Sequence, residues 1–294
     1  MPRLAANRFS WTRRTTSSKV DAWFEELAYL GPGRVMVTEL AGSSAARVQA
    51  HGLSRREADA LVENHGGSVA EARWLTAVNP PQRAPIRIRG RLSVVSTEQE
   101  RTREAEAGRP PALWVPAGMA FGTGEHATTS MCLRHVADLS RNLPAGTWSF
   151  LDLGTGSAIL AMAARVLGAG EVLGTDFDAM AVRVARENVR ANEIKGIELK
   201  RSDVLSWTPV RTWDIVAANL FSGVLVEAAP KIAAAVAVDG CLVLSGVLRE
   251  QEGEVIEAFK ASGMRLERVT RRGKWISAVL SRLAISGGGR SKRR

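Results

Sequence analysis

The residues best suited to chemistry lie at the ends of short apolar runs in the second half of the chain. One run ends at Asp152 and leads into the glycine turn Gly154-Thr155-Gly156, and the next run ends at Asp176. Glycines let a backbone turn tightly and let a ligand lie against it, because no Cβ intervenes. An acid about 20 residues further on can accept both hydroxyls of a ribose. The spacing therefore predicts a site that binds a nucleoside.

Two more polar residues follow the next apolar runs, Asp203 after the third and Asn219 after the fourth. Ligands of open parallel sheets bind outside the carboxyl ends of the strands, so these residues are expected near Asp176. Asp203 is placed to meet an adenine edge. Asn219 is no base, although its side-chain carbonyl can accept a hydrogen bond from a ligand. It could instead cap the helix that follows.

The glycine turn does not fit two common nucleotide sites. A dinucleotide fingerprint expects a third glycine where this chain has Ile159. A phosphate-binding loop expects a glycine, a lysine and a hydroxyl residue in succession, and this run is absent from the turn. A ligand without a pyrophosphate fits better, and S-adenosylmethionine is the obvious candidate.

The elements that position these residues alternate between short strands and helices from about residue 113 onward. Such alternation predicts an α/β fold with a doubly wound parallel sheet covered on both faces. Asp178 is expected to cap the helix after the second strand, and Pro230 is expected to kink or split a later helix. The turn residues Arg272-Gly273 predict a closing hairpin.

The first 98 residues predict a small α+β domain. Ser54 and Glu57 form a capping-box pattern before a helix that ends at Gly66, and residues 21–30 predict another helix. A polar run then predicts an exposed linker between two domains. The resulting division has four parts: a small domain at 1–98, a linker at 99–112, a catalytic domain at 113–283 and a flexible basic tail at 284–294.

The net charge of +10 is concentrated at the two ends of the chain. Residues 1–20 carry five arginines or lysines without an acid, residues 286–294 carry four, and the remainder is nearly neutral. Basic ends suit weak, salt-sensitive contact with RNA or the ribosome, although a solvated tail without a specific role is the favoured explanation. Two distant cysteines exclude a disulfide scaffold, and no metal site and no membrane span are expected. A reducing, cytoplasmic location is expected.

The segment GMAFGTGEHATTSMCL, residues 118–133, resembles a signature of the ribosomal protein L11 methyltransferases of bacteria. The elements DLGTGSA and AANL, and the order of the later strands, match the same family from about Pro85 to Leu280. The resemblance implies a seven-stranded class I methyltransferase sheet, which is Rossmann-like, and S-adenosylmethionine as cofactor. It also implies a substrate-recruiting role for the N-terminal domain, where the likeness is faint. Ala158 stands where the family usually has glycine.

The resemblance assigns roles to particular residues. Five are expected to bind the cofactor, and Asn219 is also the expected catalytic residue: Thr129, Gly154, Gly156, Asp176 and Asn219. Phe121 is placed to cover the cofactor, and Gly122 and Gly124 would let a lid close over it. Thr128 or Thr129 is expected to cap the next helix while the other hydroxyl meets a ligand carboxylate. His126 is either a general base or a packed loop histidine.

The resemblance thus implies a monomeric, S-adenosylmethionine-dependent protein N-methyltransferase that acts on lysine or N-terminal α-amine groups of ribosomal protein L11. A related enzyme that methylates lysine in another protein, such as an electron-transfer flavoprotein subunit, is the nearest alternative. An RNA methyltransferase is favoured by the basic ends and disfavoured by the neutral body. A silent cofactor-binding module is disfavoured by Asp176 and Asn219.

Overall fold

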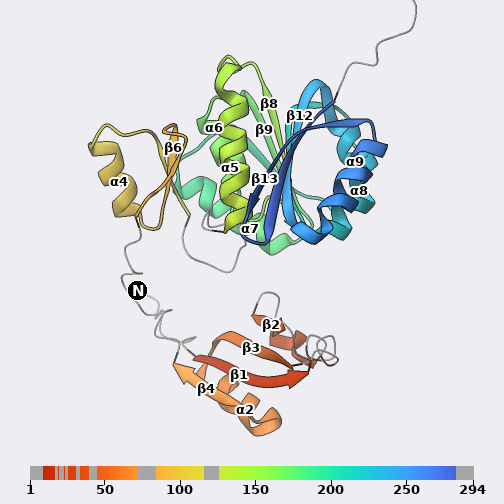
Figure 1. Ribbon diagram of the computed structural model, residues 1–294. Coiled ribbons are helices and arrows are strands. Elements are labelled where there is room, and N and C mark those ends of the chain that lie inside the picture. The colour runs from red at the N-terminus through yellow and green to blue at the C-terminus, as the bar shows by residue number, and fades with distance from the viewer. Residues whose placement is uncertain are drawn as a thin grey trace, which may run out of the picture. The chain divides into compact units, whose positions relative to one another are not determined.

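The chain forms two compact units, which meet in the sequence between Gln82 and Arg83. We call residues 1–82 the first unit and residues 83–294 the second unit, and each is described by itself (Figure 1). The computed structural model describes residues 9–16, 19, 23, 26–30, 34–39, 45–71, 84–115 and 126–282. Of the helix expected at 21–30 the structure describes residues 23 and 26–30, which include a short 3-10 helix at Ala28–Leu30. The lid residues 121–124 and the basic tail lie outside the described residues.

Four strands of the described part of the first unit form an antiparallel sheet in the order β2-β3-β1-β4. Buried and exposed side chains alternate along β3, where Val48 lies in the core and Arg47 in solvent, so one face of the sheet is apolar. Trp11, Leu53 and Leu61 pack together in that core. The elements are β1 (Phe9–Thr16), β2 (Val35–Glu39), β3 (Ala45–Leu53), α2 (Arg55–His65) and β4 (Ser68–Glu71).

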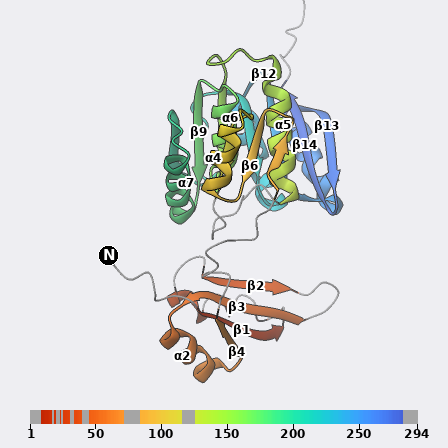
Figure 2. The same cartoon turned by 90° about the vertical axis from the view of Figure 1, so that its left-hand side faces the viewer.

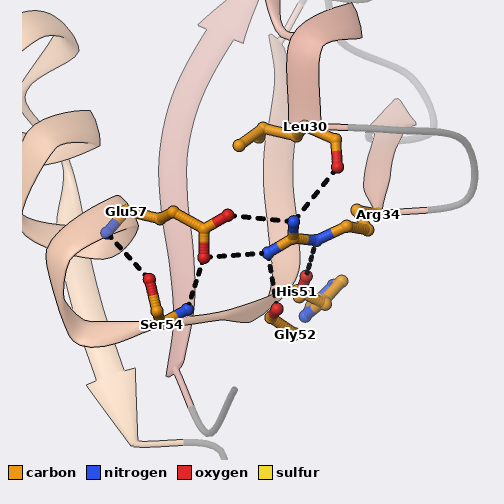
Figure 3. A network of polar contacts seen from close by, with 6 residues as sticks. All are labelled: Leu30, Arg34, His51, Gly52, Ser54 and Glu57. Atoms are coloured by element: carbon orange, nitrogen blue, oxygen red, sulfur yellow. Dashed lines mark hydrogen bonds and ion pairs between the residues drawn. The ribbon is translucent and has the colours of Figure 1, made fainter. Parts of the chain in front are cut away.

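A polar network holds the start of α2 against the sheet (Figure 3). The Ser54 hydroxyl accepts from the Glu57 N–H, and the Glu57 carboxylate accepts from the Ser54 N–H, which confirms the predicted capping box. The Arg34 guanidinium donates to both Glu57 oxygens and to the carbonyls of Leu30, His51 and Gly52. This hydrogen bond with Arg34 is the main reason why the pKa of Glu57 falls to about 2.

Seven strands of the described part of the second unit form one sheet in the order β10-β9-β8-β11-β12-β14-β13, with β14 antiparallel to its neighbours. From β8 the chain adds β9 and β10 on one side and then β11 and β12 on the other, so the strand order reverses between β8 and β11. Ligands of such sheets bind at this switch point. The strands are β8 (Ser149–Leu153), β9 (Glu171–Asp176), β10 (Ile197–Arg201), β11 (Trp213–Asn219), β12 (Val236–Leu248), β13 (Met264–Arg272) and β14 (Trp275–Arg282).

Helices cover both faces of this sheet, which confirms the predicted doubly wound α/β class (Figures 1 and 2). One apolar core forms beneath α5 (Ala127–Leu139), α6 (Ile159–Val166) and α7 (Ala179–Ala191), and the other beneath α8 (Ser222–Ala235) and α9 (Glu252–Ala261). Asp178 caps α7, as expected. Pro230 lies within α8 without splitting it, and β13 and β14 form the predicted hairpin.

The segment expected to be a linker is different in the structure. It contains helix α4 (Glu98–Glu106) and part of a small sheet, β5 (Ile86–Ile88), β6 (Leu92–Val95) and β7 (Ala112–Trp114), which faces the viewer in Figure 2. The polar composition is misleading because these charges pair with one another. Glu104 is buried and accepts from both Arg87 and Arg109. Leu92 and Leu113 join the core beneath α5, so this region belongs to the second unit.

Within the residues that the structure describes, no helix is both long enough and apolar enough to cross a membrane.

Candidate active site

The glycine turn connects β8 to α6 at the switch point of the sheet. Gly154 and Gly156 have φ values of 71° and 51°, in the left-handed region that favours glycine. A Cβ at position 154 would lie 2.3 Å from Leu220 Cδ2, so a larger residue would collide with the end of β11. The Thr155 N–H donates to the Thr175 carbonyl at 2.8 Å. The turn therefore lies between the end of β9 and Leu220, which directly follows β11.

Asp176 ends β9, and its side chain is nearly buried. Its Oδ2 accepts from the Gly156 N–H at 2.9 Å, and its Oδ1 accepts from the Asp178 N–H at 3.0 Å. A carboxylate offers about four acceptor positions, so acceptor capacity remains after these two bonds. The structure thus brings Asp176 and the glycine turn together at one edge.

A second acid, Asp152, supports the turn from within the sheet and was not among the expected site residues. It is buried, and its Oδ2 accepts from the Thr155 hydroxyl at 2.7 Å and from the Ala161 N–H at 3.2 Å. Burial raises the pKa of Asp152 to about 7. The signal that could have identified it is its place in the same DLGTG run as the two glycines.

Asn219 ends β11 and contacts Thr129, which lies 90 positions earlier in the first turn of α5. The Asn219 Nδ2 donates to the Thr129 Oγ1 at 3.4 Å. Because the amide nitrogen makes this contact, the Asn219 side-chain carbonyl remains an acceptor for another group. Thr129 is buried. Two of the expected site residues therefore meet on the α5 side of the sheet.

The caps of the two neighbouring helices differ from the expectations. Neither Thr128 nor Thr129 caps α5, because the N-cap position is His126, which makes no side-chain cap bond. The Thr128 hydroxyl instead pairs with His126 Nδ1 at 2.8 Å. The ring of Trp275 packs edge-on against His126 at 5.0 Å between centroids, as a packed loop histidine requires. Asn219 does not cap α8 either, because Phe221 occupies that N-cap position.

Asp203 lies two residues beyond the end of β10, at the same edge of the sheet. Its Oδ1 accepts from the Leu205 N–H at 3.0 Å, and its main-chain carbonyl accepts from the N–H groups of Ser206 and Trp207. The side chain is exposed, and the contact with an adenine edge stays a prediction. Phe121, Gly122 and Gly124 lie outside the described residues.

Two exposed aromatic residues at this edge were missed by the sequence analysis. Phe177 directly follows Asp176 and is 69% exposed, and Phe221 follows Asn219 by two positions and is 74% exposed. Both residues therefore present apolar surface to solvent beside a strand-end polar residue. In the sequence, both residues could have been found as aromatic residues within two positions of Asp176 and Asn219.

Comparison with known proteins agrees with this arrangement. The family model described as "Ribosomal protein L11 methyltransferase (PrmA)" matches residues 24–282. A ribosomal protein L11 methyltransferase of Pelobacter propionicus is 39% identical over 206 residues, which cover 68% of this chain and 64% of the relative. That of Geobacter sulfurreducens is 47% identical over 162 residues, which cover 55% and 52%.

A solved structure of a ribosomal protein L11 methylase from Lactobacillus delbrueckii subsp. bulgaricus is similar to the chain with a TM-score of 0.58 and 26% identity. The match covers 69% of this chain and all of that chain. This chain spans between half and two thirds of the length of the curated relatives that it matches. Since the family model extends over most of the sequence, the resemblance seen in its motifs is confirmed, and the chain belongs to the ribosomal protein L11 methyltransferase family.

Proposed function

We propose that the protein is an S-adenosylmethionine-dependent N-methyltransferase that acts on lysine or N-terminal α-amine groups of ribosomal protein L11. The observation that carries the proposal is the juxtaposition of the glycine turn and Asp176 with Asn219 at the switch point. Asp176, which is placed to bind the ribose of the cofactor, and Asn219, which is placed to bind the acceptor amine, lie at the same edge of the sheet. The names of the relatives support methyl transfer to ribosomal protein L11.

The residues present fit the cofactor. Gly154 and Gly156 present backbone without a Cβ, and Asp176 keeps acceptor positions for two ribose hydroxyls. The buried Thr129 lies in the first turn of α5, where the helix dipole favours a ligand carboxylate. We assign cofactor contacts to Thr129, Gly154, Gly156, Asp176 and Asn219. When bound, the cofactor supplies a methyl group that its sulfonium centre has already activated.

The task of Asn219 is to align the acceptor amine. An amine attacks only as the neutral base, and a lysine with a pKa of about 10.4 is almost wholly protonated at pH 7, unlike an α-amine at about 7.7–8.0. The Asn219 Oδ1 can accept a hydrogen bond from the neutral amine, because Nδ2 is directed to Thr129. A fixed acceptor at this place selects the orientation that points the lone pair along the line of transfer.

The first unit is assigned to substrate recruitment, and the second unit to chemistry. The five residues assigned to the cofactor and the amine all belong to the second unit, which leaves the first unit for the recruitment of substrate. We assign the protein to the cytoplasm as a monomer, and a weak RNA contact to its basic ends, since Arg and Lys gather there.

The test is methyl transfer from isotope-labelled S-adenosylmethionine. The purified protein and the labelled cofactor are incubated, in parallel, with purified ribosomal protein L11, with ribosomal RNA and with a cell extract. We expect label in the protein that resists nuclease and is lost with protease. Label in RNA would replace the proposal by an RNA methyltransferase. Absence of label from both, together with label in another protein of the cell extract, would retain the reaction class and overturn the substrate.

A further inference from the structure

Phe221 occupies an unusual position for a phenylalanine. It is the N-cap residue of α8, where Ser, Thr, Asp and Asn are strongly preferred because their side chains bond to free helix N–H groups. It makes no cap bond, and its ring is 74% exposed instead of joining either apolar core. Residues that break a local rule without a gain in packing mark functional places.

The backbone around Phe221 determines the side on which its ring lies. The Leu220 N–H donates to the Ser245 carbonyl at 3.1 Å, which continues the pairing of β11 with β12, and Phe221 itself is extended, with φ −65° and ψ 148°. Side chains alternate in extended chain. Leu220 is partly buried and packs against the core beneath α8 and α9. By this alternation we place its neighbours Asn219 and Phe221 on the opposite side.

That opposite side is the side of the acceptor. The Asn219 amide reaches Thr129 on α5, which shows where this side of the strand end faces. Residues two apart along extended chain are separated by roughly 6.5 Å. A lysine side chain whose amine lies at Asn219 therefore passes within contact distance of a ring at position 221.

An aromatic ring offers such a side chain two favourable contacts. The apolar face covers the alkyl stem, and the negative face attracts an ammonium, above all a methylated one. We infer that Phe221 is a specificity residue that binds the alkyl stem and the methylated ammonium of the acceptor. The inference rests on the proposed N-methyltransferase function and adds the residue that retains a partly methylated amine for a further transfer.

The chemistry of repeated transfer explains why retention matters. Each round forms one N–C bond and breaks one S–C bond, the thioether leaves, and one amine proton passes to solvent before the next round. A methylated amine is again a cation at neutral pH, so it dissociates unless a surface holds it between rounds. Phe221 supplies an uncharged surface that holds a cation and still lets the proton leave.

The first test measures binding without turnover. The full chain, saturated with S-adenosylhomocysteine, is titrated by NMR with N-acetyl-trimethyllysine amide and with its neutral isostere, in which a tert-butyl group replaces the trimethylammonium. We expect the wild type to prefer the charged probe, and Phe221→Leu and Phe221→Ala to reduce this preference about two- to five-fold. Phe221→Tyr should keep it. Equal preference in the wild type and Phe221→Leu would overturn the inference.

The second test measures products with ribosomal protein L11 as substrate. Mass spectrometry should show a larger monomethyl share for Phe221→Leu and Phe221→Ala, with unchanged affinity for S-adenosylmethionine, whereas Val238→Ala, an exposed apolar residue at the start of β12, should match the wild type. A wild-type product distribution in Phe221→Leu would contradict the role of the ring. Failure of the wild type to methylate any protein would instead contradict the proposed function, and the two failures are distinguishable.

Discussion

The Asp176 carboxylate accepts a hydrogen bond from the backbone N–H of Gly156 at 2.9 Å, so the acid at the end of β9 and the turn after β8 form one unit. The other oxygen accepts from the Asp178 N–H at the start of α7. One side chain therefore orients both a backbone turn and a helix around the place where a ribose is expected. Loss of this carboxylate should affect binding more than stability, because the strands beneath it are held by their own ladders.

Replacement of the carboxylate tests the assignment to the cofactor. Asp176→Ala should weaken the binding of S-adenosylmethionine by roughly 2–3 kcal/mol, as expected for the loss of a charged hydrogen-bond partner. Isothermal titration calorimetry measures the change. Glu198→Gln, at an exposed position on the edge strand β10, is the control that should leave the affinity unchanged. Unaltered affinity in Asp176→Ala would remove this residue from the site.

Asn219 should separate alignment from binding. If its carbonyl orients the amine, Asn219→Ala should lower the rate of the chemical step by ~10²-fold or more, whereas cofactor affinity should fall much less, because Asp176 and the glycine turn remain. Single-turnover methylation with saturating cofactor measures the step.

Asn219→Asp distinguishes this role from a merely structural one. The N-cap of α8 is Phe221, so an aspartate at 219 cannot rescue activity as a helix cap. Its negative charge would stabilise the cationic amine and the sulfonium more than the charge-dispersed transition state. Turnover at the wild-type rate in Asn219→Asp would contradict the catalytic role.

Ala158 should be a point of strain in the glycine turn. It has φ 65° and is fully buried, although the left-handed region is unfavourable for a residue with a Cβ by roughly 1–2 kcal/mol. Ala158→Gly should relieve this strain but increases the entropy of the unfolded chain, so we expect the free energy of unfolding to rise by about 1 kcal/mol. Urea unfolding measures it. Ala163→Gly, within helix α6, should have the opposite sign, and destabilisation by both variants would contradict the strain.

The Arg34–Glu57 network should make the first unit sensitive to acid. The pKa of Glu57 is about 2 in the folded chain, below its ordinary value of 4.5, so its stabilising contribution is complete above pH 4.5 and is lost as the pH falls towards 2. The difference in the urea midpoint between the wild type and Glu57→Gln should therefore shrink over this range. Glu63→Gln removes an exposed carboxylate of the same helix outside the network and is the matched control. A constant difference for Glu57→Gln would refute the linkage.

Removal of the first unit tests its recruiting role. A variant that begins at Arg83 keeps the small sheet and the core residues Leu92 and Leu113, so it should fold and bind cofactor. Its kcat/KM for intact ribosomal protein L11 should fall ~10²-fold, because a second binding contact raises the effective concentration of substrate. A short peptide that carries the acceptor amine but lacks the rest of ribosomal protein L11 should react equally with both forms. Undiminished methylation of the intact protein would exclude recruitment.

Local patterns in the sequence are sufficient for the features that depend on neighbouring residues. The capping box at Ser54 and Glu57 and the N-cap at Asp178 each satisfy free helix N–H groups within three positions, so the residues that decide them are adjacent in the chain. The ends of β9 at Asp176 and of β11 at Asn219 can also be predicted from neighbouring residues, because apolar runs of strand length end where polar residues begin. The alternation of these runs with helices then determines the fold class.

The tertiary structure decided whatever depends on partners far away in the chain. The segment at 98–106 is polar, yet its helix buries Glu104, because this carboxylate pairs with Arg87 from a separate strand and with Arg109. The contact of Asn219 with Thr129 joins residues 90 positions apart, and local sequence patterns do not predict contacts between residues so far apart in the chain. The exposure of Phe221 also depends on the core, because the core determines the face of the sheet against which Leu220 packs. The alternation of side chains then assigns Asn219 and Phe221 to the other face.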